Sequence, residues 1–135
     1  MTEEFPHIDK PSPVTDVPII ESRPEARRIQ ALWPLRNLHS DLDGDGIEYA
    51  VLTVTHSRSR RAYGATINRQ ERFSRIVRVN PFDAAPVGRL TPTRRFSQNS
   101  LQVAFAAALQ TLRAQIAAGD QQLASYFTPS DATTR

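Results

Sequence analysis

Three short runs of β-branched and aromatic residues in the middle third of the chain most constrain what it can fold into. They read IEYAVLTVTH, AYGATINR and RFSRIVRVN, and only a few polar residues separate each run from the next. Runs of this length and composition are typical of strands, and short polar connections favour antiparallel pairing. The sequence therefore predicts a meander over 47–56, 62–69 and 72–80 that ends before Pro81, with a further strand over 87–96.

A helical pattern follows the strands. Apolar residues recur every three or four positions from Leu101 to Ile116, which is the spacing of one helical face. Asn99 or Ser100 is placed to cap the start of this helix, and Gly119 is placed to end it. A sheet with a long helix across it belongs to the α+β class, so we expect an antiparallel three- or four-stranded meander packed against this C-terminal helix.

The N-terminal third predicts an extended arm and then a short helix. Four prolines within residues 1–21 remove backbone donors and disfavour helix. The pattern of Ser22, Pro24 and Glu25 is typical of a helix start, because serine and glutamate can satisfy the exposed backbone amides there. Pro34 should end this helix. Its buried stripe would consist of Ile29, Leu32 and Trp33.

The chain length limits the number of domains. A chain of 135 residues supports one core, because domains commonly contain about 100 to 150 residues. We expect an extended arm over 1–21, a single α+β domain over 22–127 and a flexible tail over 128–135. The sequence shows no secretion signal, no apolar run as long as a membrane span, and no cysteine. These features predict a soluble protein of a reducing compartment, the cytoplasm.

The charges are segregated along the chain. Residues 1–55 hold five basic side chains against ten acidic ones, whereas residues 56–95 hold ten arginines against Glu71 and Asp83. Such segregation often accompanies a charged partner, although an acidic arm folded over a basic face would give the same pattern. A GC-rich coding sequence would also account for the excess of arginine over lysine.

The arginines gather at one expected hairpin and on one expected sheet face. The turn between the first two strands of the meander contains three arginines within a few residues. Period-two alternation in the third strand puts Arg72 and Arg78 on one face, which a helix on the other face would leave in water. The candidate binding residues are His56, Arg58, Arg60, Arg61, Arg69, Arg72 and Arg78.

This surface has three interpretations. Its guanidinium groups can neutralise the phosphates of a nucleic acid, and Tyr49 or Tyr63 would stack on an unpaired base if exposed. The same groups can bind an acidic protein, which would make the chain an adaptor or inhibitor. They can also simply keep a sheet face soluble. We favour a small non-enzymatic nucleic-acid-binding protein, of the kind common as accessory factors in bacteria, phages and mobile elements.

One short motif resembles a calcium-binding loop. Asp41, Asp43 and Asp45 alternate within the segment DLDGDG, as in the opening of an EF-hand loop. The twelfth position, where an EF-hand places a bidentate glutamate, is Leu52. We therefore expect an Asp/Gly turn, with calcium as the alternative and no other cofactor. The sequence also lacks the HExxH, GxSxG and GxGxxG motifs, so we expect no enzyme.

Overall fold

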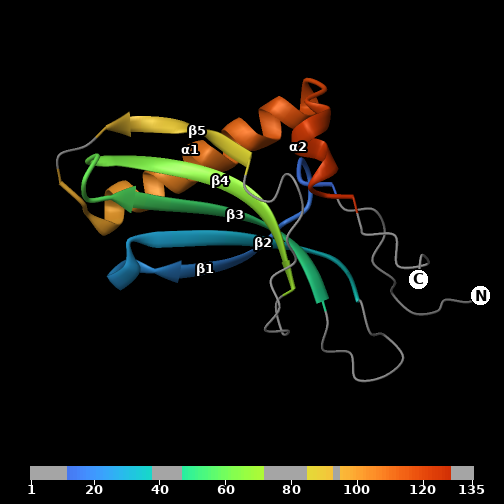
Figure 1. Ribbon diagram of the computed structural model, residues 1–135, viewed down its shortest axis with the longest axis horizontal. Coiled ribbons are helices and arrows are strands. Elements are labelled where there is room, and N and C mark those ends of the chain that lie inside the picture. The colour runs from blue at the N-terminus through green and yellow to red at the C-terminus, as the bar shows by residue number, and fades with distance from the viewer. Residues whose placement is uncertain (1–11, 38–46, 72–84, 93–94, 129–135) are drawn as a thin grey trace, which may run out of the picture.

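The computed structural model describes residues 12–37, 47–71, 85–92 and 95–128, and these form one antiparallel sheet with a long helix across it (Figure 1). The five strands lie in chain order: β1 (Ile19–Arg23), β2 (Arg28–Asn37), β3 (Ile47–Ser57), β4 (Ala62–Glu71) and β5 (Ala85–Pro92). A 3₁₀ turn, Pro24–Ala26, joins β1 to β2. The helices are α1 (Gln98–Ala117) and the short α2 (Gln121–Ser125). The α+β class is confirmed, and the described residues form five strands where we expected three or four.

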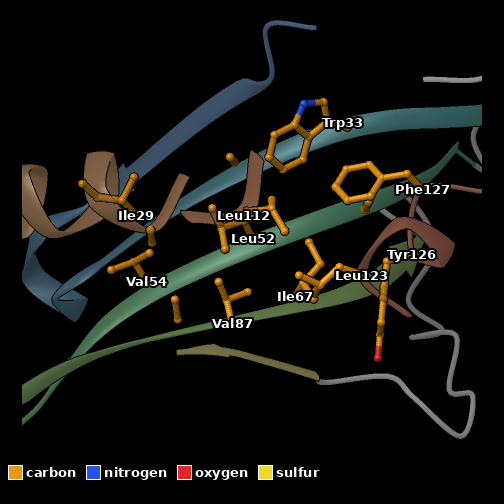
Figure 2. Packing of buried hydrophobic residues seen from close by; sticks show 14 of the residues in the cluster. Ile29, Trp33, Leu52, Val54, Ile67, Val87, Leu112, Leu123, Tyr126 and Phe127 are labelled. Atoms are coloured by element: carbon orange, nitrogen blue, oxygen red, sulfur yellow. The ribbon is translucent and has the colours of Figure 1, made fainter. Parts of the chain in front are cut away.

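The main core lies between the sheet and the two helices. Buried side chains alternate along the strands, as the pleat requires, and α1 contributes Leu101, Ala104, Ala108 and Leu112 from one stripe. Figure 2 shows this layer, in which Trp33 and Phe127 meet edge to face with ring centroids 5.1 Å apart. The layer holds the sheet and helices together and fixes the outward direction of the intervening strand residues.

Both helices begin with a side-chain cap. Ser97 Oγ accepts a hydrogen bond from the backbone amide of Ser100, so α1 starts earlier than the predicted caps, Asn99 or Ser100, would allow. Asp120 caps α2 in the same way. Gly119 lies between the helices with φ of 103°, a conformation that glycine adopts with little strain, and the prediction that α1 ends there is confirmed.

The short helix predicted after Ser22 was wrong, because this segment is a β-hairpin. The capping pattern forms only the 3₁₀ turn Pro24–Ala26, and Arg27 then reverses the chain with φ of 54°. Beyond the turn the buried residues alternate with period two, as Ile29, Ala31, Trp33 and Leu35. Pro34 fits in a strand because it lies at a register shift and beyond the residues that pair with β1.

The N-terminal segment is held against α1 by Arg113. Its Nε donates to the carbonyl of Pro13 at 2.8 Å, and its Nη2 donates to the carbonyl of Asp16 at 3.0 Å. Pro13 is buried, whereas Val17 is 89% exposed, so proline packing and these hydrogen bonds secure the segment. The first strand, β1, begins at Ile19, within the range 1–21 predicted as an extended arm.

Two expectations lie outside the described residues. The predicted third strand over 72–80 and most of the predicted tail over 128–135 belong to this part of the chain. In the structure β4 pairs directly with β5, the further strand expected over 87–96. Within the described ranges, no helix combines the length and apolarity needed to cross a bilayer.

Candidate functional site

Two turns that are distant in sequence lie side by side at one end of the sheet. In a meander each turn reverses the chain, so the β1–β2 and β3–β4 turns share an end, at the left of Figure 1. Arg28 pairs with Thr55 across β2 and β3, and the backbone amide of His56 donates to the carbonyl of Arg27 at 3.1 Å. This end gathers six arginines, which we name the arginine cluster: Arg23, Arg27, Arg28, Arg58, Arg60 and Arg61.

The outer members of the arginine cluster point into water. Arg23, Arg58, Arg60 and Arg61 are exposed, and none forms an ion pair with a carboxylate of the described residues. Glu25 is the sole acidic residue within the two turns themselves. The end of the sheet therefore carries a concentrated positive charge that the described part of the chain does not neutralise.

Serine side chains shape the β3–β4 turn. Ser57 Oγ accepts from the backbone amide of Arg60 at 3.2 Å and lies 3.2 Å from the hydroxyl of Ser59. The amide of Arg61 donates to the carbonyl of Ser57 at 2.8 Å, and Arg61 adopts φ of 52°. This left-handed conformation is unfavourable for a residue with a side chain, and the surrounding hydrogen bonds hold it in place.

His56 is buried next to the arginine cluster and contacts Arg27. It is 8% exposed, and its ring packs against Tyr63 and Phe96 at centroid distances of 4.8 and 5.7 Å. Its Nδ1 lies 3.2 Å from Nη1 of Arg27, whose guanidinium also stacks 4.8 Å above the Phe96 ring. Because a guanidinium can only donate, Nδ1 is the acceptor. His56 therefore positions Arg27 and does not lie on the surface, where we expected it as a binding residue.

Arg69 also lies away from the expected surface. Its Nε and Nη2 both donate to Oε2 of Glu48, at 3.1 and 2.5 Å, and the Glu48 side chain is fully buried. The pair faces the helices, since Arg69 is opposite the buried Ala50 in the β3–β4 register. Seven residues of strand from Ala62 put it about 23 Å from the β3–β4 turn. The expectation that Arg69 joins the hairpin arginines on one water-facing side is wrong.

The tyrosines proposed for base stacking are buried. Tyr63 is 3% exposed, under the segment that precedes α1, and its hydroxyl lies 3.4 Å from the carbonyl of Ser97 as a donor. Tyr49 is 6% exposed and packs with Leu32 and Val51 in a small cluster. Neither ring is available to stack on an unpaired base.

The remaining predicted site residues lie outside the described part of the chain. They are Arg72 and Arg78 of the expected sheet face, and Asp41, Asp43 and Asp45 of the expected calcium loop. Among the residues that the structure describes, no group of three or more carboxylate or imidazole side chains is arranged to hold a metal ion. The calcium alternative stays a prediction.

Three of the six arginines in the arginine cluster were not among the predicted binding residues. Arg23, Arg27 and Arg28 belong to the acidic part of the sequence and were expected on a short helix. The period-two alternation of apolar residues from Ile29 to Leu35 was the signal for a strand, and a strand there would have paired the two turns. Comparisons with known protein families, curated proteins and solved structures found no match.

Proposed function

We propose that this protein binds nucleic acid, without catalysis, by neutralising backbone phosphates with its arginine cluster. The observation that carries the proposal is the placement of four exposed arginines on two adjoining turns, without an ion-pair partner among the described residues. They are Arg23, Arg58, Arg60 and Arg61. A patch of this kind attracts a polyanion over the Debye length and binds it by releasing condensed counterions.

The first helix adds to this positive potential. Phe96, which contacts Arg27 and His56, lies immediately before Ser97, the N-cap of α1. The N-terminal end of α1 therefore adjoins the arginine cluster, and its first turn contains no acidic residue. A helix N-terminus carries a partial positive charge, which favours phosphate nearby.

A polyanion fits the cluster better than an acidic protein does. At the centre of a protein interface, aromatic and large apolar side chains usually accompany arginine. The exposed large apolar residues of the described chain are Val14, Val17, Ile19, Ile20 and Val103, and none lies in the two turns. Binding through phosphate contacts alone carries no base sequence information, so we expect little sequence preference.

We also propose a cellular location and a role for the protein. A chain without cysteine suits the reducing cytoplasm, where DNA and RNA are both available to a small basic protein. A nucleic-acid accessory factor of a bacterium, phage or mobile element is the role that we propose.

Charge substitution within the cluster tests the proposal by fluorescence anisotropy, with a short labelled DNA duplex and its separate strand as probes. The double variant Arg58→Gln with Arg60→Gln should bind more weakly, and its salt dependence should fall by about 1.8 in slope, since each lost phosphate contact removes about 0.9. Gln121→Glu with Gln122→Glu is the control, because it changes the net charge equally at exposed positions of α2.

The two variants separate a local site from overall charge. Equal weakening in both would mean that net charge alone drives binding, and the cluster would have no special role. Wild-type protein that binds neither probe at low salt would overturn the proposal. Co-purification of an acidic protein would then favour the alternative partner.

A further inference from the structure

A hollow on the face of the sheet opposite α1 adjoins the arginine cluster. Its volume is about 370 Å³, at the lower end of the range of about 300 to 1,000 Å³ typical of small-molecule sites. Three neighbouring strands and the β3–β4 turn line it with Thr53, Thr55, Arg60, Gly64, Ala65, Thr66, Pro86 and Gly88. The threonines alternate with core residues such as Val54, so they lie on the face opposite α1.

The lining of the hollow suits an anionic, oxygen-rich group. Three threonine hydroxyls and the guanidinium of Arg60 supply hydrogen-bond donors, and the described lining contains no carboxylate and no aromatic ring. Of the three threonines, Thr53 already bonds to Gln30 Nε2 at 3.1 Å. Thr55 and Thr66 have no such contact with another described side chain, so their hydroxyls can donate to a ligand.

Two glycines keep the hollow open. Glycine weakens a strand interior, and in a strand it often marks either a bulge or the close approach of a ligand. A Cβ atom added at Gly64 or Gly88 would meet no heavy atom within 4 Å, and neither residue has the positive φ that would require glycine. Each glycine lies beside a register shift between β4 and β5, where a bulge can account for it, and the missing side chains leave space that a ligand can enter.

We propose that the hollow holds a sugar–phosphate segment of the bound nucleic acid, with Arg60 shared between the hollow and the arginine cluster. This inference rests on the proposed function and deepens it, because it places the strand's path across β3, β4 and β5. Charge complementarity selects this occupant, since Arg60 is the one charged residue of the described lining. The threonine hydroxyls and Arg60 then donate to phosphate oxygens, and the glycines admit the sugar.

Filling the hollow tests this inference without changing any charge. Gly64→Val adds a side chain into the open space, and β-branched residues favour strands, so the fold should be retained. The same anisotropy assay with the labelled duplex should show at least a fivefold loss of affinity. Asn68→Val is the matched control, because it places a valine on the same face of β4 but away from the hollow. This variant should bind like the wild type.

A second variant removes a donor and keeps the shape of the side chain. Thr66→Val should weaken binding about two- to tenfold, which is the effect of one lost hydrogen bond. Thr66→Val also tests the inference if the Gly64→Val protein does not fold. The backbone amide signals of Gly64 and Gly88 should shift when the unlabelled duplex is added to ¹⁵N-labelled protein.

The outcomes distinguish the inference from the proposed function. If Arg58→Gln with Arg60→Gln weakens binding but Gly64→Val and Thr66→Val leave it unchanged, the arginine cluster binds the duplex and the hollow does not. If the wild type binds no nucleic acid, both the proposed function and the inference about the hollow are wrong. Selective loss of affinity in the two hollow variants, with Asn68→Val unaffected, supports the path of the nucleic acid across the hollow.

Discussion

The buried ion pair of Arg69 and Glu48 allows a test of whether Arg69 stabilises the fold or binds nucleic acid. Substituting Arg69→Met removes both guanidinium hydrogen bonds from Oε2 of a carboxylate that is fully buried. Breaking a buried ion pair on one side typically costs about 3 to 5 kcal/mol, since the remaining charge stays desolvated. The Arg69 side chain is 11% exposed, so the expected loss in the free energy of unfolding is near the lower limit of this range, about 3 kcal/mol.

Thermal unfolding followed by circular dichroism measures this loss. For a chain of this size, 3 kcal/mol corresponds to a fall in melting temperature of about 10 °C. The double variant Arg69→Met with Glu48→Leu should recover part of the stability, because an apolar pair of similar size leaves no desolvated carboxylate at position 48. The two losses should therefore be strongly non-additive.

Nucleic-acid binding supplies the second readout. Folded Arg69→Met should bind the duplex like the wild type, because the residue lies about 23 Å along the strand from the β3–β4 turn. A melting temperature within 2 °C of wild type, together with a large loss of affinity, would refute the structural assignment of Arg69.

Three further substitutions test the local structure around the helices and the N-terminal segment. Ser97→Ala removes the cap of α1 and should lower the free energy of unfolding by about 1 kcal/mol, measured by urea denaturation; an unchanged midpoint would contradict the capping role. Gly119→Ala forces a side chain into φ of 103° and should cost about 1 kcal/mol in the same assay, whereas a gain in stability would be inconsistent with that backbone geometry. Arg113→Gln should detach residues 12–16 from α1 and speed amide hydrogen exchange in that segment, and equal exchange in both proteins would show that the two carbonyl contacts do not secure it.

The elements that the sequence predicted are those with a clear local signal. The β-branched and aromatic composition of β3 and β4 and the three- and four-residue spacing in α1 each match one secondary structure, and the structure has strands and a helix there. The N-terminal hairpin was mistaken for a helix because its turn contains a helix-capping pattern. Local hydrogen bonds at Ser22, Pro24 and Glu25 support either structure, and pairing of β2 with β3 decides between them.

The candidate site was predicted only in part, because it depends on tertiary pairing. Arg58, Arg60 and Arg61 are close in sequence, so the hairpin alone indicates a basic turn. Arg27 joins them through the alignment of β2 against β3, which no local pattern specifies. The burial of Glu48 beside Arg69 likewise follows from the position of the helices, and nothing in the charge pattern distinguishes Arg69 from the other arginines of residues 56–95.

The salt dependence of DNA affinity tests the central claim most directly. Four exposed arginines that each neutralise one phosphate predict a slope of about −3.6 in log affinity against log salt, at about 0.9 per contact. Affinity for the labelled duplex should therefore fall about 150-fold between about 50 and 200 mM salt. A slope near zero, or no binding at the lower concentration, would contradict the assignment of the arginine cluster as a phosphate-binding surface.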